Sequence, residues 1–162
     1  MKFKIIMFAS LLIMSCSYSV YTTGYPHLKT IQVLPVENQT SSYDLRDMVF
    51  NSLVDNYQSD GRLKLVGMSP DCQLECRILD YTNKIISYSG SSIDEYEVRV
   101  LFDITFTDLK KNQVIWQNGS LMQSERYSLT DENSLYNSEE DAQEEITSKL
   151  FDTIMKNTLE EW

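Results

Sequence analysis

The stretch IDEYEVRVLFDITFT, residues 93–107, decides the fold of this chain. Apolar side chains fill every second position from Tyr96 to Phe106, and most positions between them are polar or charged. Because successive side chains of a β-strand point to opposite faces, this pattern predicts a long strand with one buried face. A polar turn at 108–112 and a second β-rich run at 113–124 predict an antiparallel partner strand.

The partner strand has apolar residues at both odd and even positions, so neither of its faces is purely polar. Simple alternation places Val114 and Trp116 on one face, and Ile115 and Leu121 on the other. Upstream, residues 30–36 and 62–66 predict two short strands, and Pro35 limits the first of them to a sheet edge or a strand end.

A longer strand is predicted over residues 71–82. Cys72 and Cys76 alternate there with polar residues, and four residues of strand separate them by about 13 Å. A disulfide cannot bridge that distance. We therefore interpret both cysteines as free thiols that act as small core residues, because a metal or redox site would need a turn and more ligands.

Two segments predict amphipathic helices. Ser41, three residues before Asp44, has the spacing of a capping box, and an apolar stripe follows as far as Gly61. Ser138 begins the second helix, which starts with three acidic residues and carries an apolar stripe to Trp162 at the chain end. The expected fold class is α+β: a two-layer sandwich with two helices packed on one face of a mostly antiparallel four- or five-stranded sheet.

The N-terminus has the pattern of a secretory signal. Residues 1–15 combine two early lysines with an apolar run too short to span a membrane, and small Ser15 precedes Cys16. This order is typical of a bacterial lipobox, so we expect cleavage before Cys16 and acylation of that cysteine with chains such as palmitate, which anchor the protein. We expect residues 16–29 to be a tether, with His27 facing solvent, and residues 30–162 to form one domain.

Charge and motifs narrow the functional classes. Removal of residues 1–15 takes away two lysines and leaves 12 basic against 24 acidic side chains, a net charge of −12. This charge argues against a nucleic-acid partner. The sequence has no nucleophile elbow, phosphate-binding glycine loop or metalloprotease motif, so we predict no enzyme and no cofactor. A hydrolase with paired carboxylates stays open as an alternative.

The sheet face opposite the helices is the expected contact surface. It would carry charged and apolar residues together, as a polar-rimmed interface does: Arg77, Leu79, Tyr81, Arg99 and Leu101. The simpler interpretation is that Arg77 and Arg99 form ion pairs with neighbouring residues Glu75, Glu95 or Glu97. Lys110 and Lys111, at the hairpin turn, are either solvated or contact an anionic lipid head group.

Several short segments, taken in order, resemble the lipopolysaccharide-assembly lipoproteins, the LptE family. The resemblance covers nearly all of the chain after residue 15, and the segments that carry it are Cys16-Ser17-Tyr18-Ser19, residues 26–31, residues 36–40, residues 62–66, Asp71-Cys72-Gln73-Leu74-Glu75-Cys76, Tyr96-Glu97-Val98-Arg99-Val100, Val114-Ile115-Trp116 and the Glu-rich last helix. Cys76 departs from the small residue that the family often has at this position.

The resemblance implies a two-layer α/β domain in the outer membrane, anchored through Cys16. Such a domain plugs the lumen of a large β-barrel translocon (LptD type) and supports delivery of lipopolysaccharide to the outer leaflet. Direct lipopolysaccharide binding is a weaker implication, because the net charge of −12 opposes a phosphorylated lipid. A periplasm-facing regulator, such as an activator of a cell-wall synthase, is the alternative from another class. The short tether favours the barrel-associated role, because a regulator that must cross the cell wall would need a longer linker.

Overall fold

The computed structural model describes residues 24–89, 92–131 and 134–160. Its elements follow the order β1 (Thr30–Val33), β2 (Glu37–Asn38), α2 (Leu45–Asp60), β3 (Lys64–Leu65), β4 (Cys72–Ser89), β5 (Ser92–Asp108), β6 (Gln113–Tyr127) and α3 (Glu139–Thr158). The signal segment, Cys16 and Trp162 lie outside the described residues. No helix in the described parts of the chain is long and apolar enough to cross a membrane.

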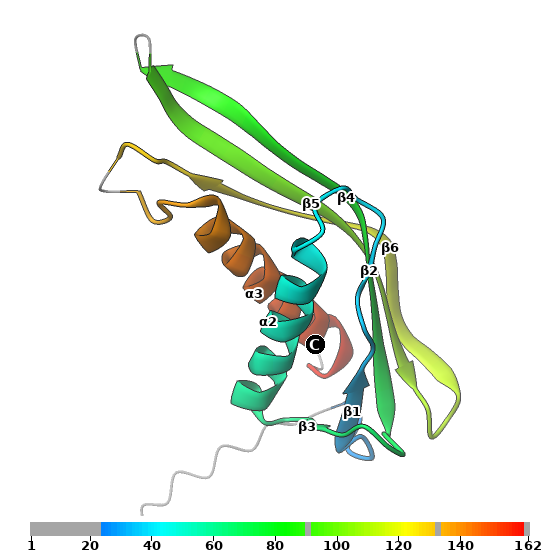
Figure 1. Ribbon diagram of the computed structural model, residues 1–162. Coiled ribbons are helices and arrows are strands. Elements are labelled where there is room, and N and C mark those ends of the chain that lie inside the picture. Colours follow the sequence, from blue (N-terminus) through cyan, green and yellow to red (C-terminus); the bar gives the residue numbers. More distant parts are fainter. Residues whose placement is uncertain (1–23, 90–91, 132–133, 161–162) are drawn as a thin grey trace, which may run out of the picture.

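One curved sheet carries both helices on the same side (Figure 1). Its order is β3-β1-β4-β5-β6, and the two-residue β2 pairs with β4 off this path. β4, β5 and β6 are antiparallel, whereas β1 and β2 run parallel to β4. The predicted α+β class and two-layer arrangement are confirmed, and the short β2 raises the strand number to six.

The core lies between the sheet and the helices. Phe102, Ile104 and Phe106 of β5 are fully buried, as the alternation predicted. From the helix side, Tyr57 of α2 meets Phe151 of α3 edge to face, with ring centroids 4.9 Å apart. Cys72 and Cys76 are buried free cysteines, as predicted, and burial raises the pKa of each thiol to about 12.

The first helix begins later than its predicted capping box. α2 starts at Leu45, and its N-cap, Asp44, makes no side-chain cap hydrogen bond. The preceding residues form a turn around Asn38 instead, whose side-chain oxygen accepts from the Thr40 backbone N–H at 2.9 Å. Asn favours such local turns, which compete with helix for the backbone donors.

The second helix starts where the sequence predicted. The Ser138 side chain accepts a hydrogen bond from the Asp141 backbone N–H at 3.0 Å, and the acidic first turn lies at the positive end of the helix dipole. The helix ends at Thr158 rather than continuing to the chain end, with Leu159 as its C-cap.

The predicted tether is partly folded onto the domain. Leu28 is buried, and the His27 Nε2 atom lies 2.5 Å from the Oδ2 atom of Asp108. The prediction that His27 faces solvent as a linker residue is therefore wrong, because β5 ends in a buried carboxylate that needs a partner. The packed part of the chain begins before Thr30.

Two bulges in β6 overturn the predicted faces of the partner strand. Phe106 lies opposite Trp116 whereas Thr107 lies opposite Val114, so the register shifts at Ile115. A further shift follows between Phe102 and Ile104, and Leu121 then lies opposite Phe102. Directly opposed residues share a face. Trp116 and Leu121 therefore lie on the helix side together, while Val114 is half exposed on the other side.

Candidate partner interface

The side of the sheet away from the helices, which we call the outer face, is the main candidate surface. In the described residues both helices cover the opposite side, so β4, β5 and β6 present one uncovered face (Figure 1). Arg77 of β4 lies directly opposite Asp103 of β5 on this face, and the two side chains form an ion pair. The predicted partner of Arg77 was a neighbouring glutamate, and cross-strand register selects Asp103 instead.

Arg99 of β5 is also paired. Its Nε atom lies 2.6 Å from Oε2 of Glu97 on the same strand, and Arg126 of β6 approaches the other oxygen of Glu97 at 3.9 Å. Half of the Arg99 side chain remains exposed, and nearly half of Arg77. The carboxylates of both pairs are only 12% exposed, so a guanidinium group that turned to a partner would leave a nearly buried acid without its cation unless the partner replaced that contact.

Apolar side chains lie among these ion pairs. Leu101 of β5 and Met122 of β6 are opposed in register, and Met122 is 59% exposed. They line a shallow hollow of about 160 Å³ together with Asp80, Thr82, Lys84, Arg99 and Val100. The outer face thus combines charged and apolar surface, as the sequence predicted.

Tyr81 is the predicted outer-face residue that the structure places elsewhere. A bulge at Leu79 shifts the register between Ile78 and Asp80, and Tyr81 then lies opposite Val100 on the helix side. Its hydroxyl donates to Glu139 of α3 and accepts from the Gln143 side chain at 2.8 Å. Burial, together with the Glu139 carboxylate, raises the Tyr81 pKa.

A projecting hairpin, residues 84–89 and 92–96, extends beyond the helices (Figure 1). Ile85, Ile86 and Tyr88 are 41%, 39% and 65% exposed there. Tyr96 stacks on Tyr127 of β6 at a centroid distance of 4.9 Å, where the hairpin leaves the helix-covered part of the sheet. The strand predicted over residues 71–82 stops short of this tip, although the adjacent Ile85 and Ile86 break the alternation and could have marked it.

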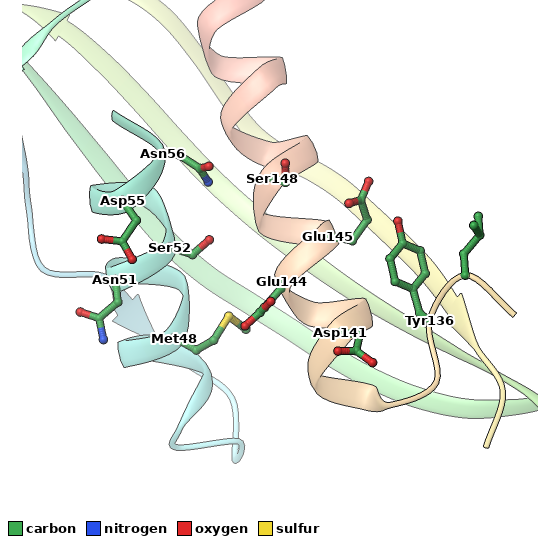
Figure 2. Close-up of a pocket in the computed structure, with 11 residues that line it drawn as sticks. Met48, Asn51, Ser52, Asp55, Asn56, Tyr136, Asp141, Glu144, Glu145 and Ser148 are labelled. Carbon is green, nitrogen blue, oxygen red and sulfur yellow. The ribbon is translucent and has the colours of Figure 1, made fainter. Parts of the chain in front are cut away.

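A hollow lies between the two helices, on their side away from the sheet. It has a volume of about 740 Å³, and Figure 2 shows Met48 of α2 and Glu144 of α3 pointing toward each other across it, with Glu145 beside Tyr136 on the other side of α3. No group of three or more acidic, histidine or cysteine side chains suited to a metal ion occurs in the described parts of the chain. The hollow has no histidine or cysteine among its lining residues.

The lysines of the β5–β6 turn differ from each other. Lys110 Nζ lies 2.8 Å from Oδ1 of Asp71 and 3.0 Å from the backbone oxygen of His27, so this half-exposed side chain is held against the surface of the domain. Lys111 is exposed, and only its backbone N–H is held, by Oδ1 of Asp108 at 2.9 Å. The structure therefore brings Lys110 and Lys111 to the opposite end of the sheet from the projecting hairpin (Figure 1).

The sequence matches a family model, described as "LptE: Lipopolysaccharide-assembly", over residues 28–158. The chain belongs to the LptE family. The resemblance predicted from the sequence is thereby confirmed, and the matched segment includes both helices and all six strands. No curated protein sequence matches the chain.

Two solved structures share the fold. The hypothetical protein CT253 from Chlamydia trachomatis superposes with a TM-score of 0.55 at 13% identity, over 79% of this chain and 94% of that one. Protein XCC0632 from Xanthomonas campestris gives a TM-score of 0.53 at 15% identity, over 86% of this chain and 93% of that one. At such identities the likeness concerns the fold alone. Membership of the LptE family makes this chain a lipopolysaccharide-assembly protein.

Proposed function

We propose that this LptE-family protein is an outer-membrane lipoprotein, held by acylated Cys16, that assembles with a large β-barrel translocon of the LptD type and occupies its lumen. In this role it supports delivery of lipopolysaccharide to the outer leaflet and needs neither catalysis nor a cofactor. The family match supports the lipopolysaccharide pathway. The observation that carries the plug role is the uncovered outer face together with the projecting hairpin.

The outer face suits a contact with the inside of a barrel wall. It offers two half-exposed guanidinium groups beside Leu101 and the exposed Met122. Polar groups with some apolar area are what the water-facing interior of a large barrel can match. In addition, Asp103 Oδ1 is buried and accepts no hydrogen bond from any described residue, so a donor from a partner would satisfy it.

Arg77 and Arg99 are the outer-face residues we assign to contact with the barrel or with lipopolysaccharide phosphates. Arginine binds carboxylate and phosphate with two parallel hydrogen bonds. Here both arginines already hold carboxylates, which a partner's acidic groups would have to replace. We therefore place barrel contact before direct lipopolysaccharide binding.

Pull-down on this protein after mild detergent extraction of the outer membrane tests the proposal. We expect recovery of a large β-barrel in stoichiometric amount. Leu101→Glu with Met122→Glu should strongly reduce recovery, because two charges would enter the contact. The matched control is Leu129→Glu with Leu135→Glu, which are exposed at 62% and 89% outside the sheet and should leave recovery unchanged. Recovery of a cell-wall synthase in place of the barrel would overturn the proposal and favour the regulator.

The anchor has its own test. Cys16→Ala should leave the domain folded, as circular dichroism would show, and release it from membranes. Continued sedimentation of this variant with membranes would contradict lipid anchoring.

A further inference from the structure

The end of the sheet farthest from the projecting hairpin gathers three segments that are distant in sequence: the entry segment, residues 64–71 and the β5–β6 turn. Lys64 at the start of β3 donates its backbone N–H to the Lys29 carbonyl at 2.9 Å. Leu109 in the β5–β6 turn donates its backbone N–H to the Asp71 carbonyl, also at 2.9 Å. The loop between β3 and β4 therefore adjoins both the turn and the segment by which the chain enters the domain (Figure 1). We give the name basal surface to six exposed residues of this end: Lys29, Lys64, Met68, Leu109, Lys110 and Lys111.

The exposed charge of the basal surface is positive. Of the seven lysines that follow residue 15, four lie here and the other three are Lys84, Lys149 and Lys156. Two carboxylates of this end turn inward, whereas Glu160, near the entry segment, is 47% exposed and pairs with Arg62. Asp71 accepts from the backbone N–H groups of Lys29 and Thr30 at 2.7 and 3.0 Å, and Asp108 is buried against His27.

This charge contrasts with the rest of the chain. The net charge after residue 15 is −12, and the acidic first turn of α3 lies toward the projecting hairpin. The molecule is therefore polarised, with its positive end where the chain enters. A positive patch on a strongly acidic protein directs that one surface toward negative partners.

Two apolar side chains lie among the basal lysines. Met68 is 85% exposed in the β3–β4 loop, and Leu109 is 39% exposed in the β5–β6 turn. The hydrogen bond between Leu109 and Asp71 holds these two loops together. Lysines around exposed apolar side chains form the combination that binds a lipid interface: the ammonium groups meet head groups and the apolar groups enter the acyl boundary.

We propose that the basal surface docks the unassembled lipoprotein on the anionic phospholipid surface of the membrane that holds its acyl chains. This inference rests on the lipid anchor of the proposed function and not on the barrel. The eight residue steps from Cys16 to Gly24 can reach at most about 29 Å, which keeps the entry segment close to the membrane. Docking leaves the projecting hairpin, at the far end, free to meet the barrel.

Hydrogen exchange of the full lipidated protein in vesicles tests the docking. Vesicles of phosphatidylcholine are compared with vesicles that also contain phosphatidylglycerol. In the anionic vesicles we expect backbone amides of residues 66–69 and 109–112 to exchange more slowly, by a factor of up to about five. Each lysine at an anionic surface strengthens binding by roughly that factor. High salt should remove the difference, because it screens exposed charges.

Matched double variants make the test specific. Lys111→Glu with Met68→Asp should abolish the protection by anionic lipid. Lys84→Glu with Met122→Asp makes the same two kinds of substitution at exposed residues outside the basal surface, and should retain the protection. Equal exchange in the two lipids, or full protection in the first variant, would overturn the docking.

Three further outcomes separate the causes of failure. Protein that floats with both kinds of vesicle but shows no lipid-dependent protection retains its anchor and refutes only the docking. Protein that fails to float refutes the anchor as well. Protection that appears without lipid and rises with protein concentration would assign the basal surface to a second copy of the chain and overturn the membrane assignment.

Discussion

The two long strands β4 and β5 pass through two different environments. Under the helices, from Cys72 to Ile78 and from Val98 to Phe106, every second side chain is buried. In the projecting hairpin the same two strands continue to pair, yet Ile85 and Ile86 stay about 40% exposed. The strand pairing of the hairpin therefore continues beyond the helix layer, and the stack of Tyr96 on Tyr127 lies at its base. The helix layer decides which part of the two strands forms a core, and the uncovered part is available to a partner.

Removal of an aromatic side chain from the core should cause the largest loss of unfolding free energy. Phe102→Ala deletes a fully buried ring in β5, and we expect it to cost about 3–5 kcal/mol of unfolding free energy. Urea unfolding followed by tryptophan fluorescence measures this. Leu135→Ala, 89% exposed, is the control and should cost less than about 0.5 kcal/mol. A loss for Phe102→Ala as small as that of the control would mean that the helices do not seal the sheet.

A substitution at the boundary between the helix-covered sheet and the projecting hairpin should cause an intermediate loss of unfolding free energy. Tyr81→Phe removes the hydroxyl that joins β4 to Glu139 and Gln143 of α3, and we expect a loss of about 1 kcal/mol. Amides of the projecting hairpin should then exchange faster, because its connection to the helix layer is weakened. Tyr43→Phe, 84% exposed, is the matched control. Unchanged hairpin exchange would show that Tyr81 does not fasten the hairpin.

The hairpin tip should give the smallest effect on stability. Tyr88→Ser changes a side chain that is 65% exposed, and the unfolding free energy should stay within about 0.5 kcal/mol of the original. Recovery of the β-barrel in the pull-down should nevertheless fall. If the unfolding free energy drops by as much as for Phe102→Ala, the tip belongs to the core, and the proposed difference between the helix-covered sheet and the hairpin is wrong. If barrel recovery is unchanged, the tip is not part of the contact.

Arg77, Arg99 and Tyr81 show how well the alternation of side chains predicts which face of the sheet a residue occupies. From sequence, Arg77, Arg99 and Tyr81 share one face, because each follows the same period of two. The structure keeps both arginines on the outer face but moves Tyr81 to the helix side, since one bulged residue, Leu79, inverts the positions of β4 that follow it as far as the next register shift, after Ile85. Alternation predicts the face of a residue correctly between bulges, but the sequence does not show where a bulge occurs.

The basal end illustrates the same limit for charged residues. His27 looked like part of a linker because no apolar period surrounds it, and Asp108 looked like part of a polar turn. Their contact joins residues 81 positions apart. Such a pair leaves no local pattern, because its reason is the need of a buried carboxylate for a partner.

The sequence by itself determined the family, the α+β class, the long alternating strand and the capped second helix, because these depend on composition and on short-range periodicity. The tertiary structure alone decided how far the helices cover the sheet, where the strands bulge, which carboxylate each cation meets, and that four lysines share the basal surface. Those features depend on contacts between segments distant in the chain, where packing and the pairing of buried charges outweigh local preference.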